Sequence, residues 1–287
     1  MLKIGTMESA YCFKYGFENG IDRMRRHGYE AMDYQEFVDT DTQLFEKTSY
    51  EFETYLKFQR KVVESGGIII HQAHGPWRWP AQDATYKDRE ERFEKMVRSI
   101  EGTAILGCKN MVIHPILPFG GSDDQHEQES YEINIEFMER LANAGQKSGV
   151  TICFENMPMP CLSLGSVEAV LNFVKTINSD FFKVCLDTGH CTMFGISPGD
   201  AVRLVGKEYL HALHIHDNDG RNDRHWAPFD GVIDWGDFAK ALAEIRYEGV
   251  ISLEVKMPAN LPEKLLEYEE IGLYNRAHYI ASAVERV

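Results

Sequence analysis

Short apolar runs alternate along the chain with longer stretches in which polar and apolar residues are mixed. Several of the short runs are almost continuously apolar, as is typical of strands that are covered on both faces. We expect strands at Leu2–Met7, Ala31–Phe37, Gly67–Ala73, Asn110–His114, Val150–Glu155, Lys183–Asp187, Ala212–His216 and Val250–Val255. Short strands that alternate with helical stretches are typical of βαβ units and a parallel sheet.

The longer stretches carry apolar residues at helical spacing. Helices are expected at Tyr50–Glu64, Tyr86–Leu106, Ser130–Lys147, Val167–Ile177 and Trp235–Ile245, with a closing helix between Leu261 and Val287. Many helical stretches end in a glycine that suits a left-handed cap, namely Gly28, Gly66, Gly107, Gly149 and Gly249. No linker or low-complexity segment divides the chain. The pattern predicts one α/β domain over residues 1–287, a single (β/α)8 TIM barrel.

Polar residues interrupt the predicted strands at one recurring place, the C-terminal end. The C-terminal ends of the last four strands carry Glu155, Asp187, His214 and Glu254, which are separated by 32, 27 and 40 residues. Each gap is close to one βα repeat, and neighbouring strands lie about 4.8 Å apart, so these side chains can converge on one ion. Catalytic groups of such barrels lie at this rim. Three carboxylates and one imidazole suit Mn²⁺, Mg²⁺ or Co²⁺, so the sequence predicts a divalent-metal site.

Each of these residues also has an ordinary structural interpretation. A single carboxylate at a strand end, such as Asp187, is commonly a helix cap or an ion-pair partner. Four costly buried polar groups at one rim point to a shared cation instead. His190 can be a ligand, a substrate contact or a structural residue, and we expect a substrate contact. Trp77-Arg78-Trp79 is either a platform for sugar stacking or ordinary loop packing, and Asp88–Arg92 is expected to be a solvated helix face.

Composition narrows the choice of partners and compartment. The formal net charge is −15, with 30 Lys+Arg against 45 Asp+Glu, which disfavours nucleic acid and acidic membranes. No apolar stretch is long enough to span a bilayer, and the N-terminus does not resemble a signal peptide. The six cysteines lack the spacing of zinc or redox motifs. Cys153 and Cys185 fall inside predicted strands, so we expect a reduced, cytoplasmic protein.

Taken together, these residues resemble the xylose isomerase-like barrel superfamily, which includes sugar-phosphate isomerases and epimerases, ketose 3-epimerases and endonuclease IV. The resemblance runs in order through His74-Gly75-Pro76-Trp77, Ile113-His114-Pro115, Phe154-Glu155-Asn156, Leu186-Asp187-Thr188-Gly189-His190, His214-Ile215-His216-Asp217, His225, Ile233-Asp234-Trp235 and Leu253-Glu254-Val255. It spans nearly the whole chain.

For the epimerase-type members, the resemblance implies one divalent ion on Glu155, Asp187, His214 and Glu254. Mn²⁺ is expected first, with Co²⁺, Mg²⁺ or Zn²⁺ as alternatives. The two glutamates would act as acid and base, and His190 would hold a substrate oxygen. Further substrate contacts are expected at His74, His114, Trp77 and His225. The implied reaction moves a proton at a carbon next to a carbonyl, through an enediolate.

Two departures from the family pattern concern the substrate. Ketose 3-epimerases carry a further Glu six residues after the first ligand, where this chain has Cys161, and Pro228-Phe229-Asp230-Gly231 replaces a Pro-Gly-x-Gly loop. The same barrel serves C-glycoside-cleaving lyases, whose elimination also begins with proton abstraction beside a carbonyl. Without an obvious Lys/Arg pair at the rim, we expect an unphosphorylated sugar or glycoside. A homo-oligomer, either a dimer or a tetramer, is usual in such families.

Endonuclease IV, a phosphodiesterase with three zinc ions, is the main alternative. Its ligands would correspond to His74, His114, Glu155, Asp187, His190, His214, Asp223, His225 and Glu254, all of suitable type. Against it, Asn156–Pro160 does not match the glycine-rich loop of that family, His216–Asp219 departs from its Asn-Asp-Ser-Lys pattern, and the net charge opposes DNA. A third class is a metal-binding barrel that acts only as a subunit or sensor.

Overall fold

The computed structural model describes residues 1–120, 126–258 and 260–286. The strands are β1 (Lys3–Met7), β2 (Ala31–Tyr34), β3 (Ile69–His74), β4 (Asn110–Ile113), β5 (Thr151–Glu155), β6 (Phe182–Asp187), β7 (Leu210–His214) and β8 (Val250–Leu253). The helices are α1 (Ser9–Tyr15), α2 (Phe17–His27), α3 (Ser49–Ser65), α4 (Tyr86–Ile105), α5 (Glu127–Ser148), α6 (Val167–Ile177), α7 (Thr188–Met193), α8 (Pro198–Tyr209), α9 (Trp235–Glu244) and α10 (Glu263–Val284), with a short 3₁₀ helix η1 (Gln43–Glu46).

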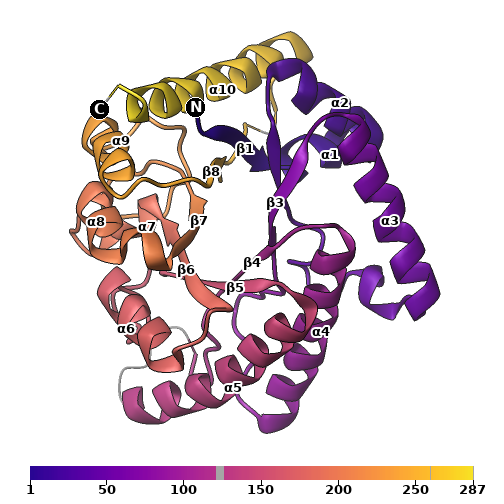
Figure 1. The fold of residues 1–287 in the computed structure, drawn as a ribbon, viewed down its shortest axis with the longest axis vertical. Helices are drawn as coiled ribbons and strands as arrows, with labels where there is room; N and C mark the ends of the chain where they lie inside the picture. The colour runs from indigo at the N-terminus through magenta and orange to yellow at the C-terminus, as the bar shows by residue number, and fades with distance from the viewer. Residues whose placement is uncertain (121–125, 259, 287) are drawn as a thin grey trace.

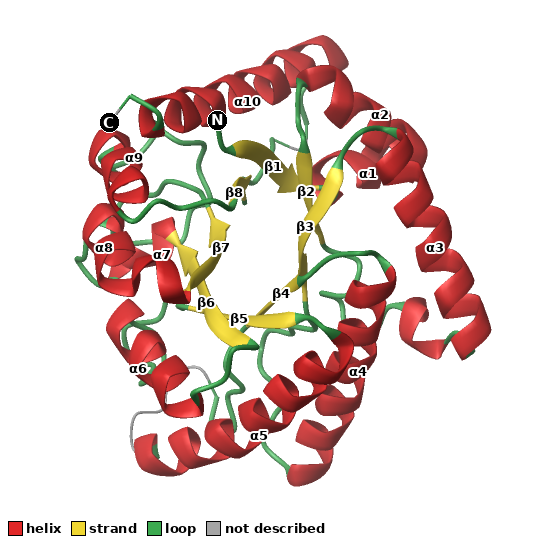
Figure 2. Ribbon diagram, viewed as in Figure 1, coloured by secondary structure: helices red, strands yellow, loops and turns green. Residues whose placement is uncertain are grey.

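The strands form one parallel sheet in the order β7-β6-β5-β4-β3-β2-β1-β8. Its two ends meet at Ile215, whose N–H donates to the carbonyl of Ser252 at 2.8 Å and whose carbonyl accepts from the N–H of Glu254 at 3.0 Å. The strands make an inner ring and the helices surround it, and the two termini lie close together beside α10 (Figures 1 and 2). The predicted single (β/α)8 barrel is therefore confirmed.

The core has an outer and an inner part. The outer part is a large cluster of buried apolar side chains that includes residues of both strands and helices, such as Phe154 and Phe173, whose rings stack at 5.0 Å. The inner part is a small cluster made of Val112, Cys153, Cys185 and Ala212. Cys153 and Cys185 lie inside strands as predicted, in β5 and β6, and both are buried. Small side chains there fit the confined interior of an eight-stranded barrel.

The predicted elements match the observed ones apart from their ends. The strand expected at Ala31–Phe37 stops at Tyr34, and the closing helix of the tail is α10. The sequence analysis did not delimit α1, α2, α7 or α8. None of the helices in the described part of the chain has the length and apolar character that crossing a bilayer requires.

The glycine caps follow the prediction only in part. A positive φ angle is found at Gly28, Gly107 and Gly149. The prediction is wrong at Gly66, which keeps a right-handed φ of −77°, because the next residue, Gly67, takes the left-handed angle instead. It is also wrong at Gly249, because the positive φ after α9 belongs to Arg246, at 55°.

The expectation of a solvated helix face over Asp88–Arg92 is wrong for Arg92. This side chain is only 1% exposed, and its Nη1 atom lies 2.5 Å from Oδ2 of Asp83, which is equally buried. The same Asp83 oxygen accepts the backbone N–H of Leu117 at 3.0 Å. The guanidinium carbon of Arg92 also lies 5.5 Å from the ring centre of Trp77. The arginine therefore faces inward and supports the loop after β3.

Candidate active site at the barrel rim

Four of the predicted residues converge at the C-terminal rim of the barrel. Glu155, Asp187 and His214 are the last residues of β5, β6 and β7, and Glu254 directly follows β8. Asp187 and His214 are paired across neighbouring strands, so they stand at the same height. Each of the four side chains offers one ligand atom, and these atoms all lie within 4.8 Å of one another.

Glu155 and His214 are the centre of this cluster, and both are almost completely buried. Nδ1 of His214 lies 2.7 Å from Oε1 of Glu155 and 3.2 Å from Oε2 of Glu254. Burial alone would raise the pKa of Glu155, but its interactions with His214 and His114 outweigh that effect and hold the pKa well below its usual range. The pKa of His214 is raised well above its usual value, because the carboxylates outweigh the effect of burial.

Asp33 is a site residue that the sequence analysis missed. It lies in β2 and is fully buried, and its Oδ2 atom is 2.9 Å from Nε2 of His214, the ring nitrogen that faces away from the cluster. Gln72 donates to the same oxygen at 2.9 Å. The available signal was weak: an acid between the apolar Met32 and Tyr34 of a predicted strand.

Asp187 is held by the residues around it. Its Oδ1 atom accepts the backbone N–H of His190 at 2.7 Å, which caps α7, and the backbone of Asp187 is clamped by the side chain of Asn156. Its Oδ2 atom lies 3.0 Å from Nε2 of His216. His216 is a second residue that the sequence analysis did not assign to the site. Its signal was the spacing of two residues from His214, which places both on one strand face.

A second cluster joins the first through Asp187. It contains His190, His216, Asp223 and His225, whose potential ligand atoms lie within 4.8 Å of one another. Nε2 of His225 is 3.0 Å from Oδ2 of Asp223, and the rings of His216 and His225 stack at 4.1 Å. Burial lowers the pKa of His190, but the neighbouring carboxylates, Asp187 first, outweigh it and raise the pKa to about 10.

The remaining predicted contacts lie on the other side of Glu155. His114 follows β4, and its Nε2 atom is 2.8 Å from Oε2 of Glu155, while Nε2 of His74 is 3.8 Å from the same oxygen. The rings of Trp77 and His114 pack edge to face, with their centroids 4.5 Å apart. His74, Glu155 and His214 form a third set of side chains that can share an ion.

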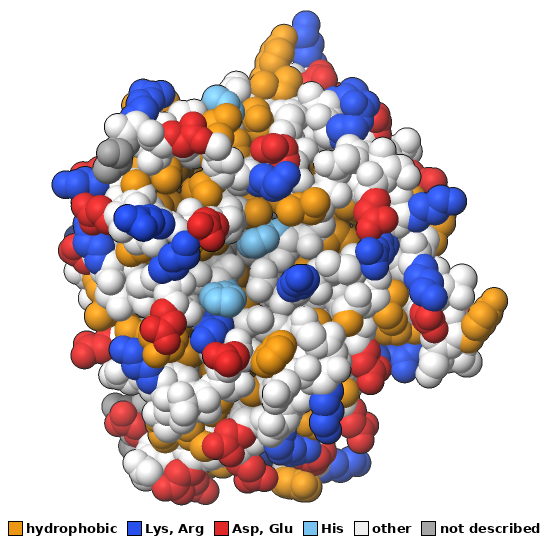
Figure 3. Space-filling view, viewed as in Figure 1, with side chains coloured by type: hydrophobic (Ala, Val, Ile, Leu, Met, Phe, Trp, Pro, Cys, Tyr) orange, Lys and Arg blue, Asp and Glu red, His pale blue; other side chains and the backbone are white. Residues whose placement is uncertain are grey.

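A cavity of about 330 Å³ opens onto these residues. Its lining includes the titratable groups His74, His114, Glu155, His190, Asp223, His225, Glu254 and Lys256. The lining also includes the apolar residues Val38, Trp77, Trp79, Met157, Pro158 and Met159. On the face seen in Figure 3, histidine side chains lie near the centre, with hydrophobic and charged side chains around them. A mostly apolar cleft with a few convergent polar groups is the usual form of a small-molecule site.

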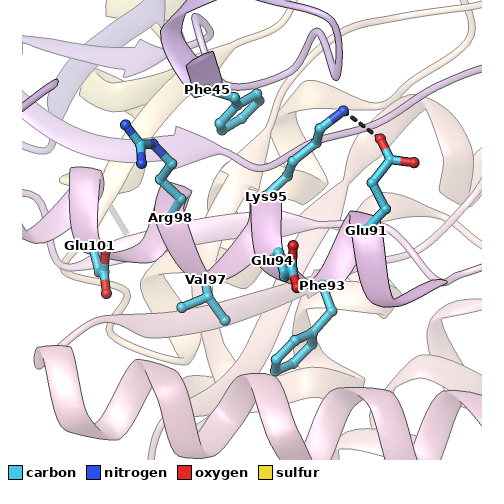
Figure 4. Close-up of a pocket in the computed structure, with 8 residues that line it drawn as sticks. All are labelled: Phe45, Glu91, Phe93, Glu94, Lys95, Val97, Arg98 and Glu101. Carbon is cyan, nitrogen blue, oxygen red and sulfur yellow. Dashed lines mark hydrogen bonds and ion pairs between the residues drawn. The ribbon is translucent and has the colours of Figure 1, made fainter. Parts of the chain in front are cut away.

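Another cavity, of about 480 Å³, lies against the outer surface of α4 (Figure 4). Its described lining comes from η1 and α4, and the lining residues Lys95 and Glu91, one turn apart on α4, form an ion pair of 2.7 Å. Among these lining residues there is no histidine. The cavity lacks the convergent ligands of the rim, so we place the candidate active site at the rim.

The rim cluster has the donors and spacing that a divalent cation requires. Mg²⁺ binds oxygen ligands at about 2.1 Å, so opposite ligands are about 4.2 Å apart. The ligand atoms of Glu155, Asp187, His214 and Glu254, all within 4.8 Å of one another, suit such an ion after small movements. Carboxylate and imidazole donors also suit Mn²⁺, Co²⁺ and Zn²⁺. These residues therefore fit a metal, although the assignment of each as a ligand stays a prediction.

Comparison with known proteins places the chain in a family. The family described as "Xylose isomerase-like TIM barrel" matches residues 21–272. The chain belongs to this family. Similar proteins include an uncharacterized protein, y4fM, of Sinorhizobium fredii, which is 26% identical over 95% of this chain and 89% of its own length. Another is the putative L-ribulose-5-phosphate 3-epimerase SgbU of Haemophilus influenzae, 23% identical over 92% of both. A third is a probable endonuclease 4 of Mycoplasmopsis agalactiae, 25% identical over 74% of this chain and 77% of that protein.

Solved structures of other proteins share the fold. A D-psicose 3-epimerase crystallised in the presence of D-fructose superposes with a TM-score of 0.80, at 18% identity, over 97% of this chain and 99% of that one. The structure of the IOLI protein with a binding zinc atom superposes with a TM-score of 0.75 at 19% identity, over 100% of this chain and 99% of that one. The resemblance noted from the sequence is confirmed at the level of family and fold.

Proposed function

We propose that this chain is a metal-dependent sugar epimerase or isomerase that moves a proton at a carbon next to a carbonyl. The observation that carries the proposal is the placement of Glu155 and Glu254, which approach the same nitrogen of His214 at 2.7 and 3.2 Å. They come from strands three apart in the barrel. The epimerases among the relatives and structural neighbours support a sugar substrate.

The chemistry divides between the ion and the two glutamates. A bound divalent cation polarises the substrate carbonyl and stabilises the negative charge that develops when the neighbouring proton leaves. A carboxylate uses one oxygen as a ligand and keeps the other free to take or give a proton. Glu155 and Glu254 would face the substrate from two sides, one removing the proton and the other returning one. Return on the opposite face inverts the carbon, which is epimerisation.

The other residues of the cavity would hold the sugar. His190, His114, His74 and His225 offer ring nitrogens to its oxygens, and Trp77 offers an aromatic face to its apolar side. Among the described lining residues Lys256 is the one Lys or Arg. Because phosphate recognition usually relies on several basic groups, we propose an unphosphorylated sugar or glycoside. Mn²⁺ is the ion that we propose first.

Exchange with deuterated water tests this function. Metal-stripped protein is reloaded with Mn²⁺, Co²⁺ or Mg²⁺ and incubated with ketoses and glycosides, and NMR detects deuterium at the carbon next to the carbonyl. We expect metal-dependent exchange in the wild type and none in Glu155→Gln or Glu254→Gln. Absence of exchange with every sugar, or full exchange in both variants, would refute the proposed mechanism.

A second candidate is a phosphodiesterase that uses three metal ions, like endonuclease IV. The observation that favours it is the presence of three groups of potential ligands in one continuous cluster. All nine residues that the sequence analysis assigned to that alternative belong to this cluster or, like His114, contact it. The net charge of −15 opposes binding to DNA. Cleavage of an abasic-site DNA duplex by the zinc-loaded protein, without sugar exchange, would favour this candidate.

A further inference from the structure

Asp33 is placed to decide which nitrogen of His214 faces the metal cluster. The two residues are 181 positions apart in the sequence, and both are completely buried, with 0% of their surface exposed. Nε2 of His214 lies 2.9 Å from Oδ2 of Asp33, whereas Nδ1 points at Glu155 and Glu254. The imidazole is thus held between an acid behind it and the candidate ligands in front of it.

The contact between Gln72 and Asp33 depends on an irregularity in the barrel. Between β2 and β3, Met32 pairs with Ile70 but Asp33 pairs with Gln72, so His71 is passed over. The shift places Gln72 beside Asp33, and Nε2 of Gln72 donates to Oδ2 at 2.9 Å and to the carbonyl of Leu213 at 3.3 Å. The side-chain amide of Gln72 is therefore held by Leu213, the residue before His214, and in turn holds the carboxylate of Asp33. This arrangement limits rotation of the carboxylate.

We propose that Asp33 is a positioning residue that keeps the N–H of His214 on Nε2 and thereby leaves Nδ1 free to bind a divalent cation. A neutral imidazole carries one N–H, and an ionised carboxylate can only accept. The oxygen of Asp33 that faces Nε2 therefore requires the proton on that nitrogen. A hydrogen bond of this kind fixes ring orientation and makes the ligand nitrogen more basic. The proposal rests on the metal site of the proposed function.

Asp33→Asn is the informative substitution. An asparagine can turn its NH₂ group toward Nε2 and so favour the proton on Nδ1, the nitrogen that would bind the ion. Loss of such a partner typically weakens metal binding by about 10- to 100-fold. The matched control is Thr6→Val, which removes a buried hydroxyl from the neighbouring strand β1, where it donates to the carbonyl of Leu253 at 3.3 Å. The control has no contact with His214 and should bind metal like the wild type.

The experiment measures binding rather than turnover. Metal-free protein is titrated with Co²⁺ in competition with a chelating dye, and thermal melting checks that each variant is folded. We expect Asp33→Asn to bind Co²⁺ about 10- to 100-fold more weakly than the wild type and Thr6→Val. Wild-type affinity in a folded Asp33→Asn variant would overturn the proposal and leave the proposed function intact.

NMR spectroscopy of the wild type tests the same proposal without the use of any variant. With Zn²⁺ as a diamagnetic ion, ¹H–¹⁵N correlation spectra identify which nitrogen of His214 carries the proton. We expect the proton on Nε2, and finding it on Nδ1 would overturn the proposal. If the wild type binds neither Co²⁺ nor Zn²⁺, the metal site of the proposed function fails, and the role of Asp33 fails with it.

Discussion

Oδ2 of Asp187 lies 3.0 Å from Nε2 of His216, and this contact joins the two clusters of potential ligands at the barrel rim. Asp187 belongs to the cluster with Glu155, and His216 belongs to the cluster with Asp223. A single buried carboxylate thus lies between two places where an ion could be held. The number of ions in the native protein therefore separates the two candidate functions.

Metal content per chain is the first prediction. We expect about one ion per chain, chiefly manganese, cobalt or magnesium, because the proposed site combines three carboxylates and one histidine, which are hard to borderline donors. Elemental analysis of protein purified without chelator measures this directly. About three zinc ions per chain would instead support the phosphodiesterase.

Glu155→Gln should reduce turnover of the sugar substrate by at least about 10²-fold, the usual contribution of a general acid or base. The amide keeps the shape of the side chain but cannot take a proton. Steady-state kinetics measures the effect, and circular dichroism checks the fold. Glu168→Gln, at an exposed position on α6, is the control and should keep wild-type turnover. Substantial activity in Glu155→Gln would show that another group moves the proton.

His190→Ala should raise KM and lower kcat while the bound metal is retained. The ring lies in the wall of the cavity, and its Nδ1 atom is 2.7 Å from the carbonyl of Asn156, which orients it. Kinetics and elemental analysis are carried out on the same preparation. His278→Ala, on α10, is the control. Loss of metal in His190→Ala would make this histidine a ligand and not a substrate contact.

Gly189→Ala should destabilise the protein by about 1–3 kcal/mol, the typical cost of overpacking. A Cβ atom at Gly189 would lie 2.0 Å from Cε1 of His216, so the imidazole must move away from Asp187. Urea unfolding measures the change in the free energy of unfolding. Gly272→Ala is the matched control, because an added Cβ there meets nothing within 4 Å. It should be neutral or stabilising within α10, and equal effects of the two substitutions would contradict the packing argument.

Asp83→Asn should lower the free energy of unfolding by about 3–5 kcal/mol, because it leaves the buried guanidinium of Arg92 without its counter-ion. Burial already lowers the pKa of Arg92, although Asp83 opposes that effect. Glu91→Gln removes one partner of the exposed Glu91–Lys95 pair and should cost less than about 1 kcal/mol. A small effect at Asp83 would mean that solvent reaches Arg92.

Much of the fold and part of the site could be predicted from the sequence. Strand periodicity and the spacing of Glu155, Asp187, His214 and Glu254 sufficed, because the C-terminal ends of parallel strands in a barrel meet at one rim. Boundaries were less predictable, as at Gly66 and Gly67, where two adjacent glycines can both end a helix and only local backbone geometry chooses between them.

The sequence by itself determined the barrel and the four side chains that face one another at its rim, since both follow from periodicity along single strands. Only the tertiary structure decided which buried side chains support this rim. Asp33 of β2 lies 2.9 Å from His214 of β7, and Gln72 lies beside Asp33 because the register of β2 and β3 shifts between Met32 and Asp33. Arg92 turns inward because Asp83 is buried beside it. Such contacts depend on barrel closure, strand register and the direction of individual side chains, and these are properties of packing between distant segments.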